Sequence, residues 1–404
     1  MDNLHLNSSF VKSLTGILWG HPYQLGVGNG LFVAFNGKGS HTHILDTNRL
    51  PANKPVQNSG YWDWKLIETE FSPSKRKRFA MASLGNGKAL LYGGLDDDGN
   101  SLSDAFIISV SFCPFCGPNK KEVYWSKTKD APVKRAKHAM AALKAGTILM
   151  YGGYDNRTHF NDAYLFSIAD DKTGKEEGEW IKTKEGPGKR DNHAMTSMGD
   201  GKILMCGGFD GGNVMNGSFI FSTNGQTGKE EGQWTTINVE TPGRRAKHAM
   251  AKLEPNKILM YGGFDNYENA EKTSFIFSTS SKTGTEKYQW QQIVDGPDVR
   301  ASHSMVTLSP GKILMYGGTS GDNNGLKNAF IFSTKSTTEK EEYQYLPTKD
   351  GPSKRNYHAM ARLNLKNVLM YGGDVDTDKF SDAFLYQVSI NDKTGEEGQQ
   401  HCTV

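Results

Sequence analysis

The sequence repeats one segment at a nearly fixed spacing, and this repeat restricts the possible folds more than any other feature. The copy that begins at Arg135 continues through His138 and an apolar stretch to the pair Gly152-Gly153. Its arginine recurs downstream at four consecutive steps of 55 residues, and one slightly longer step separates it from Arg76 upstream. A period near 50 residues, built from short apolar runs and glycines, is typical of a β-propeller, because one such unit cannot bury the faces of its sheet alone.

Each regular unit contains four predicted strands. In the unit that begins at Arg135 we expect them at residues 138–143, 147–151, 162–167 and 180–183. Their β-branched and aromatic residues, separated by glycines, favour strands over helices. The second of these strands is apolar on both sides, as expected for a sheet between two neighbouring sheets. We therefore predict an all-β propeller of four-stranded antiparallel blades, with the repeated methionines in its core.

The repeat covers nearly the whole chain, so we predict a single domain at residues 1–404. The regular units are expected at residues 76–128, 135–183, 190–238, 245–294, 300–348 and 355–404. A degenerate unit at residues 17–67 has three further predicted strands and closes with residues 62–67, but it lacks the repeated arginine and histidine. Counting this unit favours seven blades, and leaving it out gives six. Residues 10–13 match the outer-strand pattern and are expected to close the ring by completing the last blade.

Composition excludes several classes of protein. The net charge of +3 is too small to indicate a nucleic-acid-binding face, and no apolar run is long enough to cross a membrane. The N-terminal residues show no export signal. Four cysteines in 404 residues do not form a disulfide framework, so we expect a cytoplasmic protein in a reducing compartment.

The residue types that recur in the regular units follow the order Pro, Arg, His, apolar strand, Gly-Gly, Asp, aromatic strand and Trp. This order resembles the kelch repeat. The resemblance implies a β-propeller of four-stranded blades, commonly six or seven in number. It also implies a protein-interaction module, since most kelch propellers serve that purpose. A minority are enzymes, among them copper oxidases resembling galactose oxidase and plant specifier proteins that act on glucosinolate breakdown products.

The repeated polar residues are the candidate ligand-binding residues. In an antiparallel blade the start of strand one and the end of strand two lie at the same end of the sheet, so these residues are expected on one face. The set consists of Arg76, Arg135, Arg190, Arg245, Arg300, Arg355, His138, His193, His248, His303, His358, Asp155, Asp210 and Asp265. Two interpretations stay open. The arginines and histidines can stabilise the blades, with each Arg bound to an Asp of a neighbouring blade and each His bonded to a backbone carbonyl, or unpaired guanidinium groups can bind carboxylates, sulfates or phosphates.

Two local motifs have some features of metal or redox sites. Asp374, Asp376 and Asp378 alternate as in a calcium loop, but the glycine of the sharp turn and the distal glutamate are missing. Cys113 and Cys116 form one closely spaced pair without the second pair that a zinc site needs. We therefore predict no metal site and no cofactor.

A third motif bears on enzymatic activity. Asp155 and His159 match the last two residues of the Glu-x3-Asp-x3-His iron motif of plant specifier proteins, but Tyr151 stands at the glutamate position. The sequence contains no hydrolase or phosphate-loop motif. A propeller face can still gather catalytic residues from several blades without a linear motif, so an enzyme is not excluded.

We predict a non-catalytic kelch-type propeller whose Arg/His face binds another protein through an acidic segment. The first alternative is a lectin-like binder of carbohydrate or a small molecule, which would use aromatic residues such as Tyr154 and Phe264. The second is a lyase or isomerase resembling the specifier proteins. For the acidic ligand we expect binding that weakens with salt and tightens below about pH 6.5 if any of the histidines is free to protonate.

Overall fold

The computed structural model describes residues 25–28, 31–35, 42–46, 63–112, 121–156, 158–168, 177–223, 232–266, 269–281, 286–322, 324–336 and 341–388. All the regular secondary structure within these ranges is β-strand. A search of the same ranges finds no helix long and apolar enough to cross a membrane. The chain divides into two compact units, residues 1–59 and residues 60–404.

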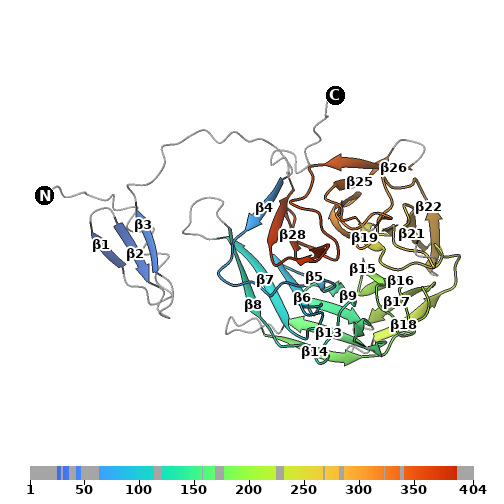
Figure 1. Ribbon diagram of the computed structural model, residues 1–404, viewed down its shortest axis with the longest axis horizontal. Coiled ribbons are helices and arrows are strands. Elements are labelled where there is room, and N and C mark those ends of the chain that lie inside the picture. The colour runs from blue at the N-terminus through green and yellow to red at the C-terminus, as the bar shows by residue number, and fades with distance from the viewer. Residues whose placement is uncertain are drawn as a thin grey trace, which may run out of the picture. The chain divides into compact units, whose positions relative to one another are not determined.

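The larger unit contains six sheets of four antiparallel strands arranged as the blades of a propeller (Figure 1). Strand one of each blade is followed in order by strands two, three and four. The first three blades consist of β5 (Ala80–Gly85), β6 (Lys88–Tyr92), β7 (Ala105–Phe112) and β8 (Lys121–Lys127); β9 (Ala139–Lys144), β10 (Thr147–Tyr151), β13 (Ala163–Ile168) and β14 (Gly178–Thr183); and β15 (Ala194–Gly199), β16 (Lys202–Cys206), β17 (Ser218–Thr223) and β18 (Gly232–Ile237). The last three consist of β19 (Ala249–Glu254), β20 (Lys257–Tyr261), β21 (Ser274–Ser281) and β22 (Glu286–Gln292); β23 (Ser304–Ser309), β24 (Lys312–Tyr316), β25 (Ala329–Ser336) and β26 (Glu341–Thr348); and β27 (Ala359–Asn364), β28 (Asn367–Tyr371), β31 (Ala383–Gln387) and β4 (Asp63–Ile67).

The sixth blade takes its outer strand from the start of the propeller unit. β4 pairs with β31, so a strand that precedes the first blade in sequence completes the last one. In β4 the ring of Trp64 lies 4.9 Å from that of Tyr316 in the fifth blade. Outer-strand aromatic residues of other blades make the same kind of contact, for example Trp180 with Tyr92 at 5.1 Å. Residues 62–67 were expected to close a degenerate blade, but residues 63–67 close the ring of regular blades instead.

Residues 10–13, which we expected to supply the closing strand, lie outside the described residues, and β4 occupies that position in the sixth blade. The predicted strands of the degenerate unit correspond to β1 (Leu25–Gly28), β2 (Leu31–Phe35) and β3 (Thr42–Asp46). These form a separate three-stranded sheet in the order β1-β2-β3. Since the described residues contain six four-stranded blades, the count of seven is not confirmed, and the alternative count of six matches the structure.

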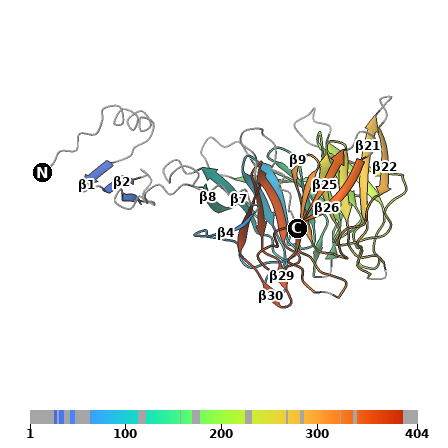
Figure 2. The same ribbon diagram turned by 90° about the horizontal axis from the view of Figure 1, so that it is seen from above.

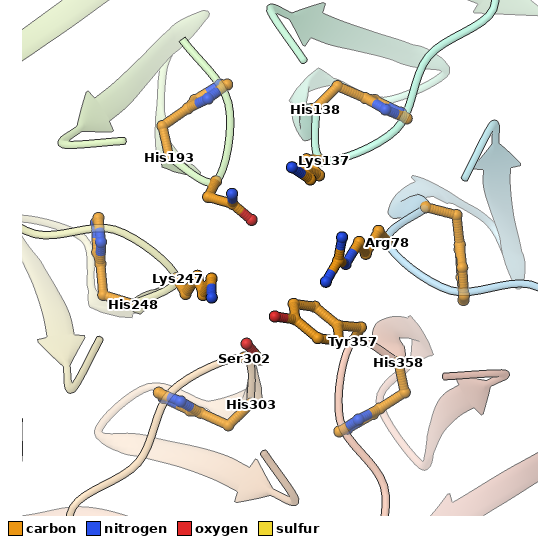
Figure 3. Close-up of a pocket in the computed structure, with 12 residues that line it drawn as sticks. Arg78, Lys137, His138, His193, Lys247, His248, Ser302, His303, Tyr357 and His358 are labelled. Carbon is orange, nitrogen blue, oxygen red and sulfur yellow. The ribbon is translucent and has the colours of Figure 1, made fainter. Parts of the chain in front are cut away.

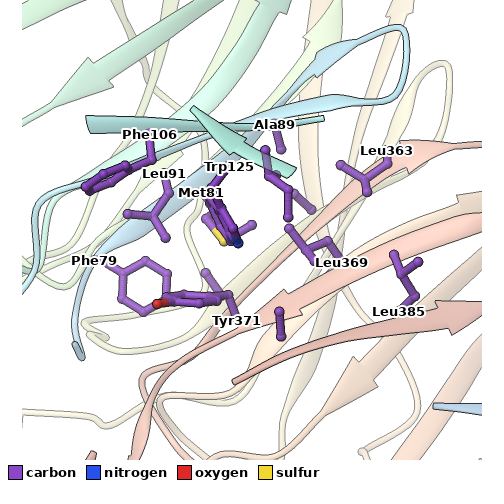
Figure 4. Packing of buried hydrophobic residues seen from close by; sticks show 14 residues of the cluster. Phe79, Met81, Ala89, Leu91, Phe106, Trp125, Leu363, Leu369, Tyr371 and Leu385 are labelled. Carbon is purple, nitrogen blue, oxygen red and sulfur yellow. The ribbon is translucent and has the colours of Figure 1, made fainter. Parts of the chain in front are cut away.

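The hydrophobic core lies between neighbouring blades. The described residues form six buried clusters, and each combines side chains of two adjacent blades. Figure 4 shows the cluster between the first and sixth blades, where Leu91 and Trp125 pack near Leu369 and Tyr371. Strand two of each blade is buried on both faces, and its methionines, such as Met150, have no exposed surface. Burial on both faces explains why this strand is uniformly apolar, as the sequence predicted.

The register of the strands places the repeated polar segments on one face of the ring. Ala139, directly after His138, pairs with Tyr151, directly before the Gly-Gly pair. Short two-stranded hairpins follow the Gly-Gly pairs of two blades, namely β11 (Tyr154–Asp155) with β12 (Thr158–His159), and β29 (Asp374–Val375) with β30 (Asp378–Lys379). The second hairpin projects from one side of the propeller when the ring is viewed edge-on (Figure 2). We call the opening of the ring on the side of the Arg-x-x-His segments the mouth.

Candidate functional site

A four-residue segment precedes the first strand of every blade, and its third residue has an unusual backbone conformation. These residues are Arg78 (φ 59°), Lys137 (φ 57°), Asn192 (φ 51°), Lys247 (φ 57°), Ser302 (φ 56°) and Tyr357 (φ 52°). A residue with a side chain adopts this left-handed region at a cost of about 1–2 kcal/mol, asparagine being the most tolerant type. The same strained turn in all six blades indicates that the surrounding structure holds it in place. We call these six residues the mouth residues.

Backbone hydrogen bonds join the mouth residues in a closed ring. Each N–H donates to the carbonyl oxygen of the mouth residue in the preceding blade. The six bonds are Lys137 to Arg78 (2.7 Å), Asn192 to Lys137 (2.9 Å), Lys247 to Asn192 (2.9 Å), Ser302 to Lys247 (2.9 Å), Tyr357 to Ser302 (3.0 Å) and Arg78 to Tyr357 (3.2 Å). This ring fixes the positions from which the six side chains project.

The mouth residues surround a cavity of about 160 Å³ on the propeller axis. Figure 3 shows Arg78, Lys137, Lys247 and Tyr357 extending toward its centre from different blades. Behind them the wall consists of Phe79 and the repeated histidines. The lining therefore contains three cationic side chains and no carboxylate. Such a concave, positively charged site attracts anions.

The six repeated arginines lie inside the blades and hold each blade's loops together. Arg135 has no exposed side-chain surface, and its guanidinium donates to both carboxylate oxygens of Asp162, at 2.7 and 2.9 Å, and to the carbonyl oxygen of Gly152. Arg76 and Arg355 bind Asp104 and Asp382 in the same way. The partner is thus the aspartate just before strand three of the same blade, and not the aspartate after Gly-Gly of a neighbouring blade.

The remaining three arginines lack this aspartate and use other acceptors. Arg190 donates to the carbonyl oxygen of Gly207 at 2.9 Å. Arg245 donates to the carbonyl oxygens of Gly262 and Pro242, and Arg300 to Asp298 and to the carbonyl oxygen of Gly317. Like the other three, they are at most 4% exposed. The buried position of all six supports a structural role, and it leaves Arg78, Lys137 and Lys247 as the lysine and arginine side chains that line the cavity.

The repeated histidines are buried between blades. Four of them pack on a tyrosine at the end of strand two in the preceding blade, with ring centroids 4.7–5.4 Å apart: His138 on Tyr92, His193 on Tyr151, His303 on Tyr261 and His358 on Tyr316. Burial and the charge of the nearby arginines hold the pKa of these four well below the usual value and lower that of His248 to about 3.

Two expectations about these histidines change as a result. Neither ring nitrogen of His138, His303 or His358 has a hydrogen-bond partner among the described residues, so the expected bond to a backbone carbonyl is not found for these three. Interactions with the backbone of Tyr151 and Cys206 oppose the lowering of the pKa of His193 and His248. A buried histidine with a depressed pKa stays neutral near pH 6. These five side chains therefore provide no group for ligand binding that tightens below pH 6.5.

A buried carboxylate lies beside one of the mouth lysines. Asp191 has no exposed side-chain surface, and its Oδ2 lies 3.5 Å from Nζ of Lys137 and 3.3 Å from Nε2 of His159. Its Oδ1 accepts a hydrogen bond from Asn192 at 2.7 Å. The carboxylate offsets part of the charge of Lys137 and orients Asn192, while Arg78 and Lys247 form no ion pair with a described carboxylate.

The aspartates after the Gly-Gly pairs shape their own loops. Asp210 accepts hydrogen bonds from the backbone N–H groups of Gly212 and Asn213, and these bonds, ahead of a small opposing effect of burial, lower the pKa of Asp210. Asp265 accepts from the backbone and side chain of Asn269 in a similar turn. Asp155 belongs to β11, which pairs with β12. None of the three lines the cavity.

The two local motifs with features of metal sites are the aspartates that begin at Asp374 and the pair Cys113 and Cys116. One carboxylate oxygen of Asp374 accepts a hydrogen bond from Nζ of Lys77 at 2.5 Å, as in a structural ion pair. Cys113 and Cys116 lie outside the described residues. Across the described part of the chain, no group of three or more His, Cys, Asp or Glu side chains has an arrangement that could hold a metal ion.

The mouth residues were not among the candidates from the sequence. Repetition drew attention to the arginines and histidines that every blade shares, whereas the mouth position changes its residue type from blade to blade. The position is nevertheless recognisable in the sequence, because it always stands two residues after the repeated arginine. Variation of residue type within a constant frame is the signal that could have identified these residues.

Comparison with protein families supports the interpretation of the repeat. A family model described as the KLHDC2/KLHL20/DRC7 Kelch-repeats domain matches residues 115–287. The chain is a kelch-repeat β-propeller. Among solved structures, the one described as "Structure of YjhT" matches with a TM-score of 0.58 and 15% identity, over 82% of this chain and 99% of the other. That similarity concerns the fold.

Curated relatives of this kelch propeller include plant proteins. Adagio-like protein 3 of Oryza sativa subsp. japonica is 22% identical over 342 residues, which are 82% of this chain and 51% of the relative. An F-box/kelch-repeat protein of Arabidopsis thaliana is 22% identical over 252 residues, which are 60% of this chain and 51% of the relative. The chain therefore spans about half the length of the curated relatives that it matches.

Proposed function

We propose that this kelch propeller is a protein-interaction module that holds an acidic segment of its partner at the mouth. The observation that carries the proposal is the lining of the cavity, where Arg78, Lys137 and Lys247 face the axis without any carboxylate among the lining residues. Hydrogen bonds between such cations and a carboxylate are shorter and about twice as strong as neutral ones. The similarity to kelch-repeat and F-box/kelch-repeat proteins supports a protein partner in general.

The rigid position of the mouth residues favours binding without rearrangement. The ring of backbone hydrogen bonds holds the six left-handed turns in place before a ligand arrives. A preorganised site loses less conformational entropy on binding than a flexible one. An extended acidic segment crossing the mouth can then contact several blades at once.

The aromatic residues near the mouth support an acidic ligand over a carbohydrate. Tyr154 and Phe264 were expected as platforms for a sugar ring. Nζ of Lys137 lies 4.6 Å from the centre of the Tyr154 ring, and Nζ of Lys247 lies 5.0 Å from that of Phe264. A sugar would have to displace these ammonium groups from the ring faces, whereas an anion would bind the ammonium groups in the positions that they occupy.

The test uses charge-neutral variants that keep an unbranched side chain at the left-handed position. A random library of displayed peptides is selected on the unmodified chain, on Lys137→Gln, on Lys247→Gln and on the double variant. Lys134→Gln is the matched control, because Lys134 is an exposed lysine only three residues before Lys137. We expect peptides rich in Asp and Glu from the unmodified chain and from Lys134→Gln.

Each mouth substitution should weaken the selected peptides by about 10- to 150-fold, which corresponds to the loss of one hydrogen bond to a charged group. Affinity should also fall with added salt, because exposed charges are screened within about 10 Å at 0.1 M ionic strength. Selected peptides without acidic residues, or acidic peptides that bind the double variant as tightly as the unmodified chain, would show that the mouth does not bind an acidic segment.

A further inference from the structure

The charge around the mouth cavity exceeds what a single carboxylate neutralises. Three cationic side chains face the axis, and the one described carboxylate paired with any of them is that of Asp191, 3.5 Å from Lys137. The cations and this carboxylate together leave two positive charges at the cavity. A ligand group with one negative charge would leave the site unbalanced.

Uncharged donors also surround the cavity. Ser302 is 8% exposed, and its hydroxyl group interacts with that of Tyr357 but forms no hydrogen bond of ordinary geometry with a described residue. In Figure 3 the hydroxyl groups of Ser302 and Tyr357 both lie toward the centre of the cavity. Among the charged donors, Nε of Arg78 is also buried and without a partner in the described part of the chain. Because a buried donor without an acceptor costs about 1–3 kcal/mol, these groups indicate a ligand with acceptor atoms.

The surroundings of Tyr357 favour donation of a hydrogen bond to an anion. Burial opposes ionisation of its phenol, but the charges of Lys247 and Arg78, together with side-chain interactions with Ser302 and Lys247, outweigh burial and lower the pKa of Tyr357 below the usual value. The Arg78 guanidinium lies 4.5 Å from the centre of the Tyr357 ring. A phenol with a lowered pKa donates a stronger hydrogen bond to an anion, which makes Tyr357 a recognition residue as well as a support for Arg78.

The donors come from five of the six blades and therefore approach the centre from several directions. A carboxylate is planar and presents two oxygens, which suits one fork-shaped partner. A phosphoryl group presents three acceptor oxygens in a tetrahedral arrangement and carries about −1.5 to −2 charge at pH 7. A cavity of about 160 Å³ is close in size to one that holds a benzene molecule, and a phosphoryl group with its ester carbon also has about six heavy atoms.

We propose that the acidic group bound at the centre of the mouth is the phosphoryl group of a phosphorylated serine or threonine in the partner protein. This inference rests on the proposed function and specifies the chemistry of the ligand. Arg78, Lys137 and Lys247 supply the positive charge, and Ser302 and Tyr357 supply neutral donors. Flanking residues of the partner segment would lie across the surrounding loops.

The experiment compares capped peptides Ac-Gly-Gly-X-Gly-Gly-NH2 in which X is phosphoserine, glutamate or serine. Both ends are capped, so the side chain of X carries the only charge. Binding to the full chain is measured by calorimetry at low salt, with inorganic phosphate as a fourth ligand. We expect the phosphoserine peptide to bind at least about tenfold more tightly than the glutamate peptide and than inorganic phosphate, and the serine peptide to show no binding.

Variants identify the site. Lys247→Gln and Ser302→Ala should each weaken the phosphoserine peptide by about tenfold, and Arg244→Gln should not. Arg244 is the control because it is an exposed cation three residues before Lys247 and does not line the cavity. Thermal unfolding of each variant verifies that the propeller is intact.

The pH dependence gives an independent readout. The second phosphate pKa lies near 6, so affinity for the phosphoserine peptide should fall as the pH is lowered from 7.5 to about 5.5, whereas affinity for the glutamate peptide should not. The charged and titratable groups that face the site are Arg78, Lys137, Lys247, Tyr357 and the five buried histidines, with Asp191 and His159 behind Lys137. Repeating the series with His159→Gln separates any contribution of that side chain from protonation of the ligand.

Three results would overturn the inference. Equal, Lys247-dependent binding of the glutamate and phosphoserine peptides would leave the proposed function standing but refute the preference for a phosphoryl group. Inorganic phosphate that bound as tightly as the peptide would indicate a site for a free anion. No binding of either acidic peptide up to about 10 mM would refute both the inference and the proposed function.

Discussion

The buried arginines should differ in their contribution to stability according to whether they face a carboxylate. We consider Arg135→Met, which keeps an unbranched side chain of similar length but removes the guanidinium group. The substitution leaves Asp162, whose side chain is 15% exposed, without its ion-pair partner, and it leaves the carbonyl oxygen of Gly152 without that donor. Removing one partner of a buried ion pair typically costs about 3–5 kcal/mol. Because Asp162 retains some contact with solvent, we expect a loss of about 3 kcal/mol in the free energy of unfolding.

Arg190→Met is the matched comparison within the repeat. Arg190 forms no ion pair in the described part of the chain, and its closest described acceptor is the carbonyl oxygen of Gly207 at 2.9 Å. Burial of the unpaired charge lowers the pKa of Arg190, so part of what the substitution removes is unfavourable. We expect a loss of about 1 kcal/mol, which is the net value of one or two hydrogen bonds.

Urea unfolding of both variants, with Lys134→Met as an exposed control, measures this difference. Unchanged m values would show that the comparison concerns the same unfolding transition. In a double-mutant cycle, Arg135→Met and Asp162→Asn should together cost at least about 1.5 kcal/mol less than the sum of the single variants. Equal losses for Arg135→Met and Arg190→Met, or no coupling in the cycle, would refute the reasoning that the carboxylate partner determines the cost.

Two further predictions concern ring closure and pH. Trp64→Ala should destabilise the propeller by about 3–5 kcal/mol, because Trp64 of the closing strand packs on the fifth and sixth blades. Leu66→Ala in the same strand removes a side chain that is 51% exposed and should cost under about 0.5 kcal/mol. Thermal and urea unfolding compare the two variants, and equal losses of stability would argue against β4 as the closing strand. The buried histidines bind protons in the unfolded chain near pH 6.5 but not in the folded one, so stability should fall as the pH drops below 6.5, by about 1.4 kcal/mol per pH unit for each histidine. His303→Phe, which copies Phe79 of the first blade, should reduce that slope in unfolding measured between pH 7.5 and 5.5, and an unchanged slope would mean that His303 does not contribute.

The blade architecture could be predicted because the repeat contains the information that each blade needs. The apolar second strand and the Gly-Gly pair recur at fixed positions, and the strands observed at Ala139–Lys144 and Thr147–Tyr151 agree with the predicted ranges to within one residue. The number of blades was harder to predict. The segment from Leu25 to Asp46 does form strands, so its local pattern imitated a blade, although it lacks the arginine that ties each regular blade together.

The closing strand depended on a contact that sequence order conceals. In most regular units an aromatic residue about 45 positions after the arginine packs on the preceding blade, as Trp180 does on Tyr92. The sixth unit has only polar residues near that position, at Gln399 and Gln400. Trp64, which precedes the first blade in the sequence, provides the missing aromatic ring. The requirement was visible in the sequence, but the partner lay some 300 residues away.

The repeat did not identify the residues of the candidate site. An arginine such as Arg135 and a histidine such as His138 recur because every blade needs them for its own packing. Lys137 stands between them in the sequence, has a left-handed backbone and lines the cavity. Sequence periodicity does not reveal that conformation, since lysine seldom adopts it, so the repeat pointed to the buried arginine and not to the partly exposed lysine.

The ring of backbone hydrogen bonds around the mouth has a consequence for its electric field. All six bonds run in the same rotational sense, from Lys137 to Arg78 and onward around the circle. Peptide dipoles arranged head to tail in a closed circle cancel along the circle, unlike those of a helix, whose ends carry partial charges. The backbone thus gives the mouth a fixed diameter without imposing a preferred sign of charge along the ring. Each blade contributes one interchangeable side chain, so a few substitutions at these positions could change the preferred ligand from an anion to a cation or a neutral group while the propeller itself stayed the same.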